Sequence, residues 1–288
     1  MTDRLAVLGS PIAHSKSPLL HRTAYDLLGL DWAYGSREVT GAELAPLVAD
    51  LDASWRGLSL TMPLKGAAFE LAGTRDAMAE LTGAVNTLRL VGAGPARALF
   101  GYNTDVAGIT RALEAVGVVS TPHVHILGGG ATAASAVVAA AELGAVSVSV
   151  FARTPEKSAP LVDLGRRAGA IVSLHPFSDG TERASPNLVI STLPGGTESP
   201  IDYPVDVRTT AALLDVAYSP WPSPLAKIWA DAGGTVANGL SMLVHQALVQ
   251  VRIFLTNDPF QPLDDEEAVL SAMLTSVGLD RNGIPLSS

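Results

Sequence analysis

Residues 123–135 of this 288-residue chain are HVHILGGGATAAS, and they carry its clearest structural pattern. An apolar run leads into Gly128, Gly130 and Ala133 in G-x-G-x-x-A spacing, and an alanine-rich segment continues to Leu143. A strand, a tight glycine turn and a helix in this order are typical of dinucleotide-binding folds, because the turn brings backbone N–H groups to a pyrophosphate. The alternative is a glycine-rich turn that binds no ligand.

Further along the chain, apolar runs alternate with helical segments. The runs are VSVSVF (146–151), AIVSL (170–174), LVISTL (188–193) and AALLDVAY (211–218), and we expect a helix from Pro155. This alternation predicts a doubly wound parallel sheet. Before the glycine loop, LAVLG (5–9) and GLSLT (57–61) alternate with helical segments at 17–28 and up to Gly83. The predicted fold class is α/β, an N-terminal α/β domain plus a Rossmann-like domain with a doubly wound parallel sheet.

A predicted helix at 106–116, ending at Gly117, joins the two series. We therefore expect domains at 1–105 and 106–239, with C-terminal helices at 240–288 that return to the first domain. The long helix expected at 240–256 is interrupted by polar residues, which favours a buried helix over a membrane span. We expect Asp264 and Glu267 to form a capping box at the start of the last helix.

Composition excludes several classes of protein. Hydrophobic residues make up 48% of the chain and charged residues 16%, as in a packed globule. The net charge of -9 argues against nucleic-acid binding. The chain has no cysteine and no visible signal peptide, so we expect a cytoplasmic protein. The six histidines lack metal-ligand spacing, so we expect no metal site and no membrane partner, only a monomer or homodimer acting on a small molecule.

The segment after VSVSVF indicates which dinucleotide binds. An NAD-binding fold usually has an acidic residue there for the ribose 2′-hydroxyl, roughly 20 residues after the glycine loop. This chain has ARTPEK (152–157) instead, in which Arg153 and Lys157 suit a 2′-phosphate. We therefore predict NADP over NAD; the alternative is an ordinary solvated basic turn.

Polar residues also concentrate in three loops of the first half, GSPIAHSKSPLLH (9–21), SLTMPLK (59–65) and GAVNT with GYNTDVAG (83–108). Each borders a predicted strand, and open α/β sheets bind ligands at the carboxyl ends of strands. Ser15 and Ser17 suit a carboxylate, whereas Thr61, Asn86 and Asp105 suit hydroxyl groups. Taken singly, each could instead be a helix cap.

Together these loops resemble those of the shikimate dehydrogenase family. The family motifs occur in order as GSPIAHSKSP, TMPLK, GAVNT, GYNTDVAG, the glycine loop, STLP (191–194), DVAYSPWPSPL (215–225) and GLSMLVHQA (239–247), and they cover nearly the whole chain. The resemblance implies an NADP-dependent oxidoreductase that reversibly reduces 3-dehydroshikimate to shikimate in aromatic amino-acid biosynthesis. It assigns residues 1–105 to substrate binding and catalysis and residues 106–239 to NADP.

The resemblance also implies individual roles. Lys65 matches the catalytic lysine, with Asp105 beside it. Substrate binding falls to Ser15, Ser17 and Tyr218 at the carboxylate and to Thr61, Asn86, Asp105 and Gln246 at the ring hydroxyls. The positions that match cofactor-binding stretches are Gly128, Gly129, Gly130, Ala131, Thr132, Ala152, Arg153, Thr154, Lys157, Val216 and Gly239.

Reduction of a ketone leaves an alkoxide that needs a proton, and Lys65 is the predicted donor. A neighbouring Asp105 carboxylate would favour the charged ammonium and orient it, which helps reduction and opposes oxidation. The alternative is a surface ion pair with no role in chemistry.

The chain departs from the family pattern at Arg22, Ser59, Ala131 and Ala152, where Asn, Asn, Gly and Asn are usual. None of these changes removes a catalytic group. Two rival hypotheses are a sister enzyme acting on quinate or aminoshikimate and a ligand-sensing protein that has lost turnover.

Overall fold

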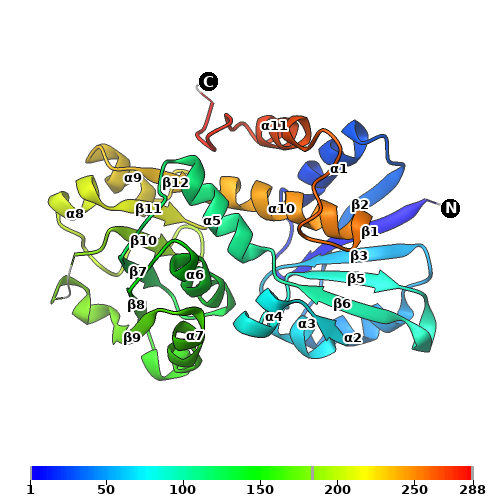
Figure 1. Ribbon diagram of the computed structural model, residues 1–288, viewed down its shortest axis with the longest axis horizontal. Helices are drawn as coiled ribbons and strands as arrows, with labels where there is room; N and C mark the ends of the chain where they lie inside the picture. Colours follow the sequence, from blue (N-terminus) through cyan, green and yellow to red (C-terminus); the bar gives the residue numbers. More distant parts are fainter. Residues whose placement is uncertain (1, 183–184, 287–288) are drawn as a thin grey trace. The chain divides into compact units, whose positions relative to one another are not determined.

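The computed structural model describes residues 2–182 and 185–286, which form two compact units (Figure 1). The first unit comprises residues 1–105 and 243–280, and the second comprises residues 106–242 and 281–288. Each unit contains one six-stranded sheet. The chain passes between the units three times, within α5 (Asp105–Ala115), within α10 (Gly239–Thr256) and after Asp280.

The first unit has a mixed sheet in the order β2-β1-β3-β5-β6-β4. The strand β1 pairs in parallel with β2 and β3, whereas β5 runs antiparallel to both β3 and β6. The strands are β1 (Asp3–Gly9), β2 (Trp32–Glu38), β3 (Trp55–Leu60), β4 (Thr74–Arg75), β5 (Thr87–Val91) and β6 (Ala98–Tyr102). The helices are α1 (Ser17–Leu27), α2 (Gly41–Asp50), α3 (Lys65–Leu71), α4 (Ala77–Thr82), the 3-10 turn η1 (Gly94–Ala96), most of α10, and α11 (Glu266–Ser276).

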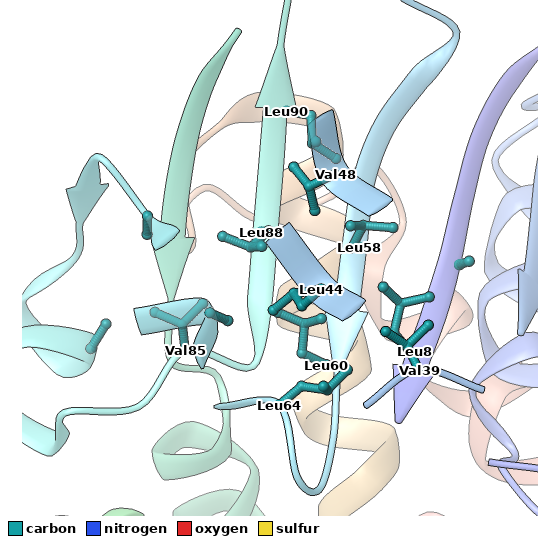
Figure 2. Close-up of a cluster of buried hydrophobic side chains, with 14 residues drawn as sticks. Leu8, Val39, Leu44, Val48, Leu58, Leu60, Leu64, Val85, Leu88 and Leu90 are labelled. Atoms are coloured by element: carbon teal, nitrogen blue, oxygen red, sulfur yellow. The ribbon is translucent and has the colours of Figure 1, made fainter. Parts of the chain in front are cut away.

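A core of aliphatic side chains lies between this sheet and helices α2 and α3. Figure 2 shows Leu44 and Val48 of α2 lying against Leu58 and Leu88 on β3 and β5. Leu64 belongs to the same cluster and is fully buried. Burying a leucine of this size contributes about 1.5–3 kcal/mol. This packing anchors the start of α3, so the next residue, Lys65, has a fixed position at the end of the sheet.

The C-terminal helices differ in one respect from the prediction. By length and composition α10 could cross a membrane, but 78% of it is buried inside the protein, as predicted for a core helix. The capping box predicted from Asp264 and Glu267 is wrong. The N-cap of α11 is Asp265, which has φ 48° and no capping hydrogen bond. The reason is Glu266, whose carboxylate binds the Arg252 side chain and the Leu263 N–H and so fixes the turn one residue later.

The second unit has the predicted parallel sheet, in the order β12-β11-β10-β7-β8-β9. Every neighbouring pair is parallel, and the order matches that of dinucleotide-binding folds. The strands are β7 (His123–Leu127), β8 (Ser147–Ala152), β9 (Ile171–Pro176), β10 (Leu188–Ser191), β11 (Ala212–Asp215) and β12 (Val236–Asn238). The other elements are α5, α6 (Ala131–Glu142), η2 (Pro155–Ser158), α7 (Pro160–Ala168), η3 (Phe177–Glu182), α8 (Val205–Thr210) and α9 (Pro224–Asp231).

Two predicted elements of this unit are interrupted. The helix expected from Pro155 is the short turn η2 followed by α7, because Pro160 lacks the N–H that a continuous helix needs and occupies the first turn of a new one. The run AALLDVAY forms a strand only as far as Asp215. The Asp215 carboxylate accepts hydrogen bonds from Ala217 N and Ser223 Oγ, which turns residues 216–222 into a loop.

Candidate active site

Lys65 and Asp105 form a partly buried ion pair in the first unit. Lys65 Nζ lies 2.5 Å from Asp105 Oδ2, and the two side chains are 11% and 6% exposed. Lys65 opens α3 and Asp105 opens α5, where the N-terminal end of the helix dipole stabilises a negative charge. Exposed surface pairs are worth only about 0–1 kcal/mol, whereas this pair is largely enclosed by protein and so is not a surface ion pair.

The second oxygen of Asp105 belongs to an amide cluster. Asn86 Nδ2 donates to Asp105 Oδ1 at 2.8 Å and to Gln246 Oε1 at 3.2 Å. Gln246 lies on α10, and its own Nε2 donates to Leu243 O at 3.0 Å. Asn86, Asp105 and Gln246 are all at least 94% buried. Four of the predicted substrate residues, counting Lys65, therefore meet at one place with donors and acceptors suited to hydroxyl groups.

The loop that leads into Asp105 is itself held by hydrogen bonds. Asn103 Oδ1 accepts from Asp105 N at 2.9 Å, and Asp76 Oδ1 accepts from Asn103 N at 3.3 Å. Asp76 is also the N-cap of α4, accepting from Ala79 N at 2.7 Å. Burial raises the pKa of Asp76 to about 6. The backbone before Asp105 is therefore held by a carboxylate whose charge is costly.

Ser15 and Thr61 lie in the loops after β1 and β3, which are adjacent strands, and Ser17 opens α1. Ser15 Oγ accepts from the Ser17 N–H at 3.3 Å where α1 begins. The two loops are joined by a hydrogen bond from Ser10 N to Met62 O at 2.9 Å. A Cβ atom at Gly9 would lie 2.4 Å from Thr61 Cγ2, so glycine is needed for this approach.

The glycine loop of the second unit has three glycines with different roles. Gly128 has φ 107°, a conformation that favours glycine, and a Cβ atom at Gly129 would lie 1.9 Å from Ser158 Oγ. Gly130 is the N-cap of α6 and provides no capping side chain. A Cβ atom built at Gly130 would have no other atom within 4 Å. The start of α6 therefore has no capping side chain at Gly130 and open space beside that residue, an arrangement that suits a phosphate.

The basic turn follows directly after β8, which ends at Ala152. Arg153, Thr154 and Lys157 are exposed. Over the described parts of the chain, the side chains of Arg153 and Lys157 have neither a hydrogen bond nor an ion pair. Both cations are consequently available to an anionic ligand.

The remaining predicted residues of this unit lie near the ends of β11 and β12. Val216 N donates to Ser191 O at 3.0 Å, and a Cβ atom at Gly239 would lie 2.4 Å from Val216 O. Glycine is therefore required at position 239 for this backbone contact. Tyr218 is half-buried in the loop after β11. Burial raises the pKa of Asp215, which holds that loop through Ser223 Oγ at 2.5 Å.

Sequence reasoning missed several buried polar residues around Asn86. Thr104 N donates to Asn86 Oδ1 at 2.9 Å, and Thr104 Oγ1 lies 3.2 Å from Gln246 Oε1. Thr87 and Gln250 also contact Asn86, through its Oδ1 and its backbone oxygen. One signal was present: Gln250 follows Gln246 by four residues and so lies on the same face of α10.

Comparison with known proteins agrees with this architecture. Residues 7–88 match the family model of the shikimate dehydrogenase substrate binding domain. The chain is 33% identical over 282 residues to the shikimate dehydrogenase (NADP(+)) of Methanothermobacter thermautotrophicus, covering 95% of this chain and 97% of that protein. It resembles the crystal structure of Mycobacterium tuberculosis shikimate dehydrogenase with 38% identity, a TM-score of 0.79, and coverage of 95% and 99% of the two chains.

A further structure bears on ligands. The shikimate 5-dehydrogenase of Thermus thermophilus, crystallised in complex with NADP(H) and shikimate, is 29% identical to this chain and has a TM-score of 0.78. The match covers 96% of this chain and 100% of that one.

Proposed function

Because this chain belongs to the shikimate dehydrogenase family, we propose that it catalyses the reversible NADP-dependent reduction of 3-dehydroshikimate to shikimate in aromatic amino-acid biosynthesis. The enzyme is an NADP-dependent oxidoreductase with a small-molecule substrate. The observation that carries the proposal is the partly buried pair of Lys65 and Asp105, 2.5 Å apart and bonded to Asn86.

In the proposed mechanism Lys65 moves the proton. Bound NADPH would supply the hydride for reduction. Lys65 Nζ then donates a proton to the oxygen of the reduced carbonyl, and in the reverse direction it accepts that proton from the hydroxyl. Asp105 orients the ammonium through its Oδ2.

The substrate would bind beside this pair. We assign the ring hydroxyls to Asn86, Asp105 and Gln246, since these groups converge at one site, and to Thr61. The carboxylate is assigned to Ser15 and Ser17 at the start of α1. The assignment of Tyr218 to the carboxylate rests on family resemblance alone.

The residues of the second unit fit NADP. The glycine loop and the start of α6, from Gly128 to Thr132, would hold the pyrophosphate, and Arg153 and Lys157 would hold the 2′-phosphate. Ala152 and Thr154, on either side of Arg153, are assigned to the same end of the dinucleotide, and the assignment of Val216 and Gly239 to NADP rests on family resemblance. We accordingly assign residues 1–105 with the C-terminal helices to substrate and residues 106–239 to NADP.

One assay separates this function from its rivals. Rates of oxidation are measured with shikimate and with quinate, each against NADP and NAD. We expect shikimate with NADP to have the highest kcat/KM. A preference for quinate would indicate the sister activity, and tight binding of shikimate without turnover would indicate a sensor. We place the enzyme in the cytoplasm as a monomer or homodimer.

A further inference from the structure

A series of hydrogen-bonded, buried polar side chains in the first unit leads to the Lys65–Asp105 pair. Tyr34 on β2 donates its hydroxyl hydrogen to Ser59 Oγ at 2.6 Å, and Ser59 donates to Gln250 Oε1 at 2.7 Å. Burial raises the pKa of Tyr34, so this hydroxyl remains a donor. Gln250 Oε1 is also 3.1 Å from His21 Nε2.

His21 has only one hydrogen to donate. It is fully buried, which lowers the pKa of His21 to about 3 and keeps the ring neutral at pH 7. Its Nε2 faces Gln250 Oε1, which can only accept, so Nε2 carries the hydrogen and Nδ1 accepts from the Tyr25 hydroxyl at 3.1 Å. Two donors therefore converge on Gln250 Oε1 and set the orientation of that amide.

With its oxygen occupied, Gln250 turns its nitrogen towards β5. Gln250 Nε2 donates to Thr87 Oγ1 at 2.9 Å, and Thr87 uses its single hydrogen to donate to Asn86 Oδ1 at 2.9 Å. Asn86 Nδ2 then donates to Asp105 Oδ1 at 2.8 Å. Every bond from Tyr34 to Asp105 runs in the same direction, with each residue donating to the next.

We propose that Thr87 and Gln250 are positioning residues of the active site, which act through Asn86 to hold the Asp105 carboxylate against Lys65. Thr87 and Gln250 are 0% and 1% exposed, so their effect would not require contact with substrate. This inference rests on the proposed function of the Lys65–Asp105 pair.

The physical reason is that the Asn86 amide has an acceptor oxygen on one side and a donor nitrogen on the other. If Asn86 Oδ1 lost the Thr87 hydrogen, Thr104 would be its remaining donor, and the less constrained amide could turn and bring an oxygen towards the Asp105 carboxylate, where two acceptors repel. Asp105 would shift, and the Lys65 ammonium would follow. Misplacement of a reacting group by about 1 Å can lower the rate about 100-fold.

The main test compares Thr87→Val, which removes only the hydroxyl hydrogen bonds, with Thr87→Ser, which keeps them. We expect Thr87→Val to lower kcat about 10- to 100-fold while the KM for NADP stays within about twofold. Thr87→Ser should restore kcat to within about threefold of the wild type. A Thr87→Val enzyme with near-normal kcat, or an equal loss in Thr87→Ser, would overturn the proposal.

A second variant tests whether the two residues act in one series. Gln250→Met keeps the length of the side chain and removes its amide, and it should lower kcat by a similar factor. The double variant should lose no more than the more impaired single variant, since residues that act as a unit are not additive. Multiplicative losses would contradict the shared pathway.

The matched control is Thr256→Val, at a position on α10, the helix that carries Gln250. Among the residues that the structure describes, the Thr256 hydroxyl bonds only backbone atoms near the end of α10, including Arg252 O at 2.8 Å. Its loss should leave kcat within about twofold while lowering stability, as expected when a local hydrogen bond is removed. An equal loss of kcat in this control would assign the Thr87 effect to general destabilisation and overturn the proposal.

Failure of the inference and failure of the proposed function give different results. If Lys65→Ala keeps normal turnover, the reactive pair is wrong and the positioning role falls with it. If Lys65→Ala is impaired and Thr87→Val is not, only the positioning role is overturned. When both are impaired, Thr87→Val should cause no further loss in the Lys65→Ala background.

Discussion

At the scale of single residues, the site depends on two opposite charges that are both largely shielded from solvent. Lys65 and Asp105 are at most 11% exposed, so each charge relies on the other and on the Asn86 amide for stabilisation. Removal of one partner from a buried pair typically costs about 3–5 kcal/mol, because the remaining charge is left uncompensated. Substitution at this site therefore affects stability as well as turnover, and both must be measured.

The first prediction concerns Lys65→Ala. Loss of the proton donor should lower kcat about 100- to 10,000-fold with little change in the KM for shikimate. Steady-state rates in both directions test this. Lys227→Ala is the matched control, because Lys227 forms an exposed pair with Asp231 at 2.7 Å on α9 and should leave kcat unchanged. Near-normal turnover of Lys65→Ala would remove this lysine from the mechanism.

The second prediction concerns Arg153→Ala. A guanidinium holds a phosphate with charge-assisted hydrogen bonds worth about 1.5–3 kcal/mol each, so the KM for NADP should rise roughly 10- to 100-fold. The KM for shikimate should change much less. Arg166→Ala is the control, since this arginine is exposed and paired with Asp163 in the same unit. Equal effects of Arg153→Ala on both KM values would contradict the assignment of the 2′-phosphate.

At the scale of elements, α4 is capped by a carboxylate that is costly to ionise. Burial raises the pKa of Asp76 to about 6, although two backbone hydrogen bonds to its carboxylate act in the opposite direction. In the unfolded chain an aspartate has a pKa of about 3.9. The folded state therefore holds the proton more tightly, so this residue contributes stability below about pH 4 that is lost as pH rises through 6.

The third prediction follows from this loss of stability as pH rises. Asp76→Asn keeps an oxygen for Ala79 N and Asn103 N but cannot ionise. Its free energy of unfolding relative to the wild type should therefore increase by about 3 kcal/mol between pH 4 and pH 8. Urea unfolding of both proteins at the two pH values measures this difference. A difference that is independent of pH would show that Asp76 is not strained by burial.

At the scale of the whole molecule, the charge state of His21 links stability to acid. The pKa of His21 is lowered to about 3, mainly by burial, whereas an unfolded histidine has a pKa of about 6.5. The folded state excludes the proton, so the stability present above pH 6.5 is lost as pH falls towards 3. Because the ring also stacks on Tyr34 with centroids 4.0 Å apart, protonation would disturb the core beneath α1.

The fourth prediction is that His21 makes the fold sensitive to acid. Between pH 6.5 and pH 3 its titration should remove up to about 5 kcal/mol of unfolding free energy. His21→Gln is less stable at pH 7 but should lose less stability over this interval, which equilibrium unfolding at several pH values can resolve. The prediction would be wrong if both proteins lost stability in parallel.

The sequence alone was sufficient for features that depend on neighbouring residues. The strand, glycine turn and helix at 123–142 are visible because backbone conformation at Gly128 and the start of α6 depends on local residue type. The all-parallel sheet of the second unit followed from continuous apolar runs, which are typical of strands buried on both faces. The first unit was harder. Its edge strand β2 is mostly exposed and lacks an apolar pattern, and nothing local indicates that β5 pairs antiparallel with β3.

The active site shows the limit of local reasoning. Lys65, Asn86 and Asp105 could be listed from their motifs, but their distances and hydrogen-bond directions could not. Asn86 and Gln246 are 160 residues apart, and Thr87 and Gln250 are 163 apart, so only the packing of α10 on the sheet brings them together. The direction of each hydrogen bond then depends on which donors are left when its neighbours are satisfied. A buried network of this kind is decided by tertiary structure, because every member is constrained by partners that are distant along the chain.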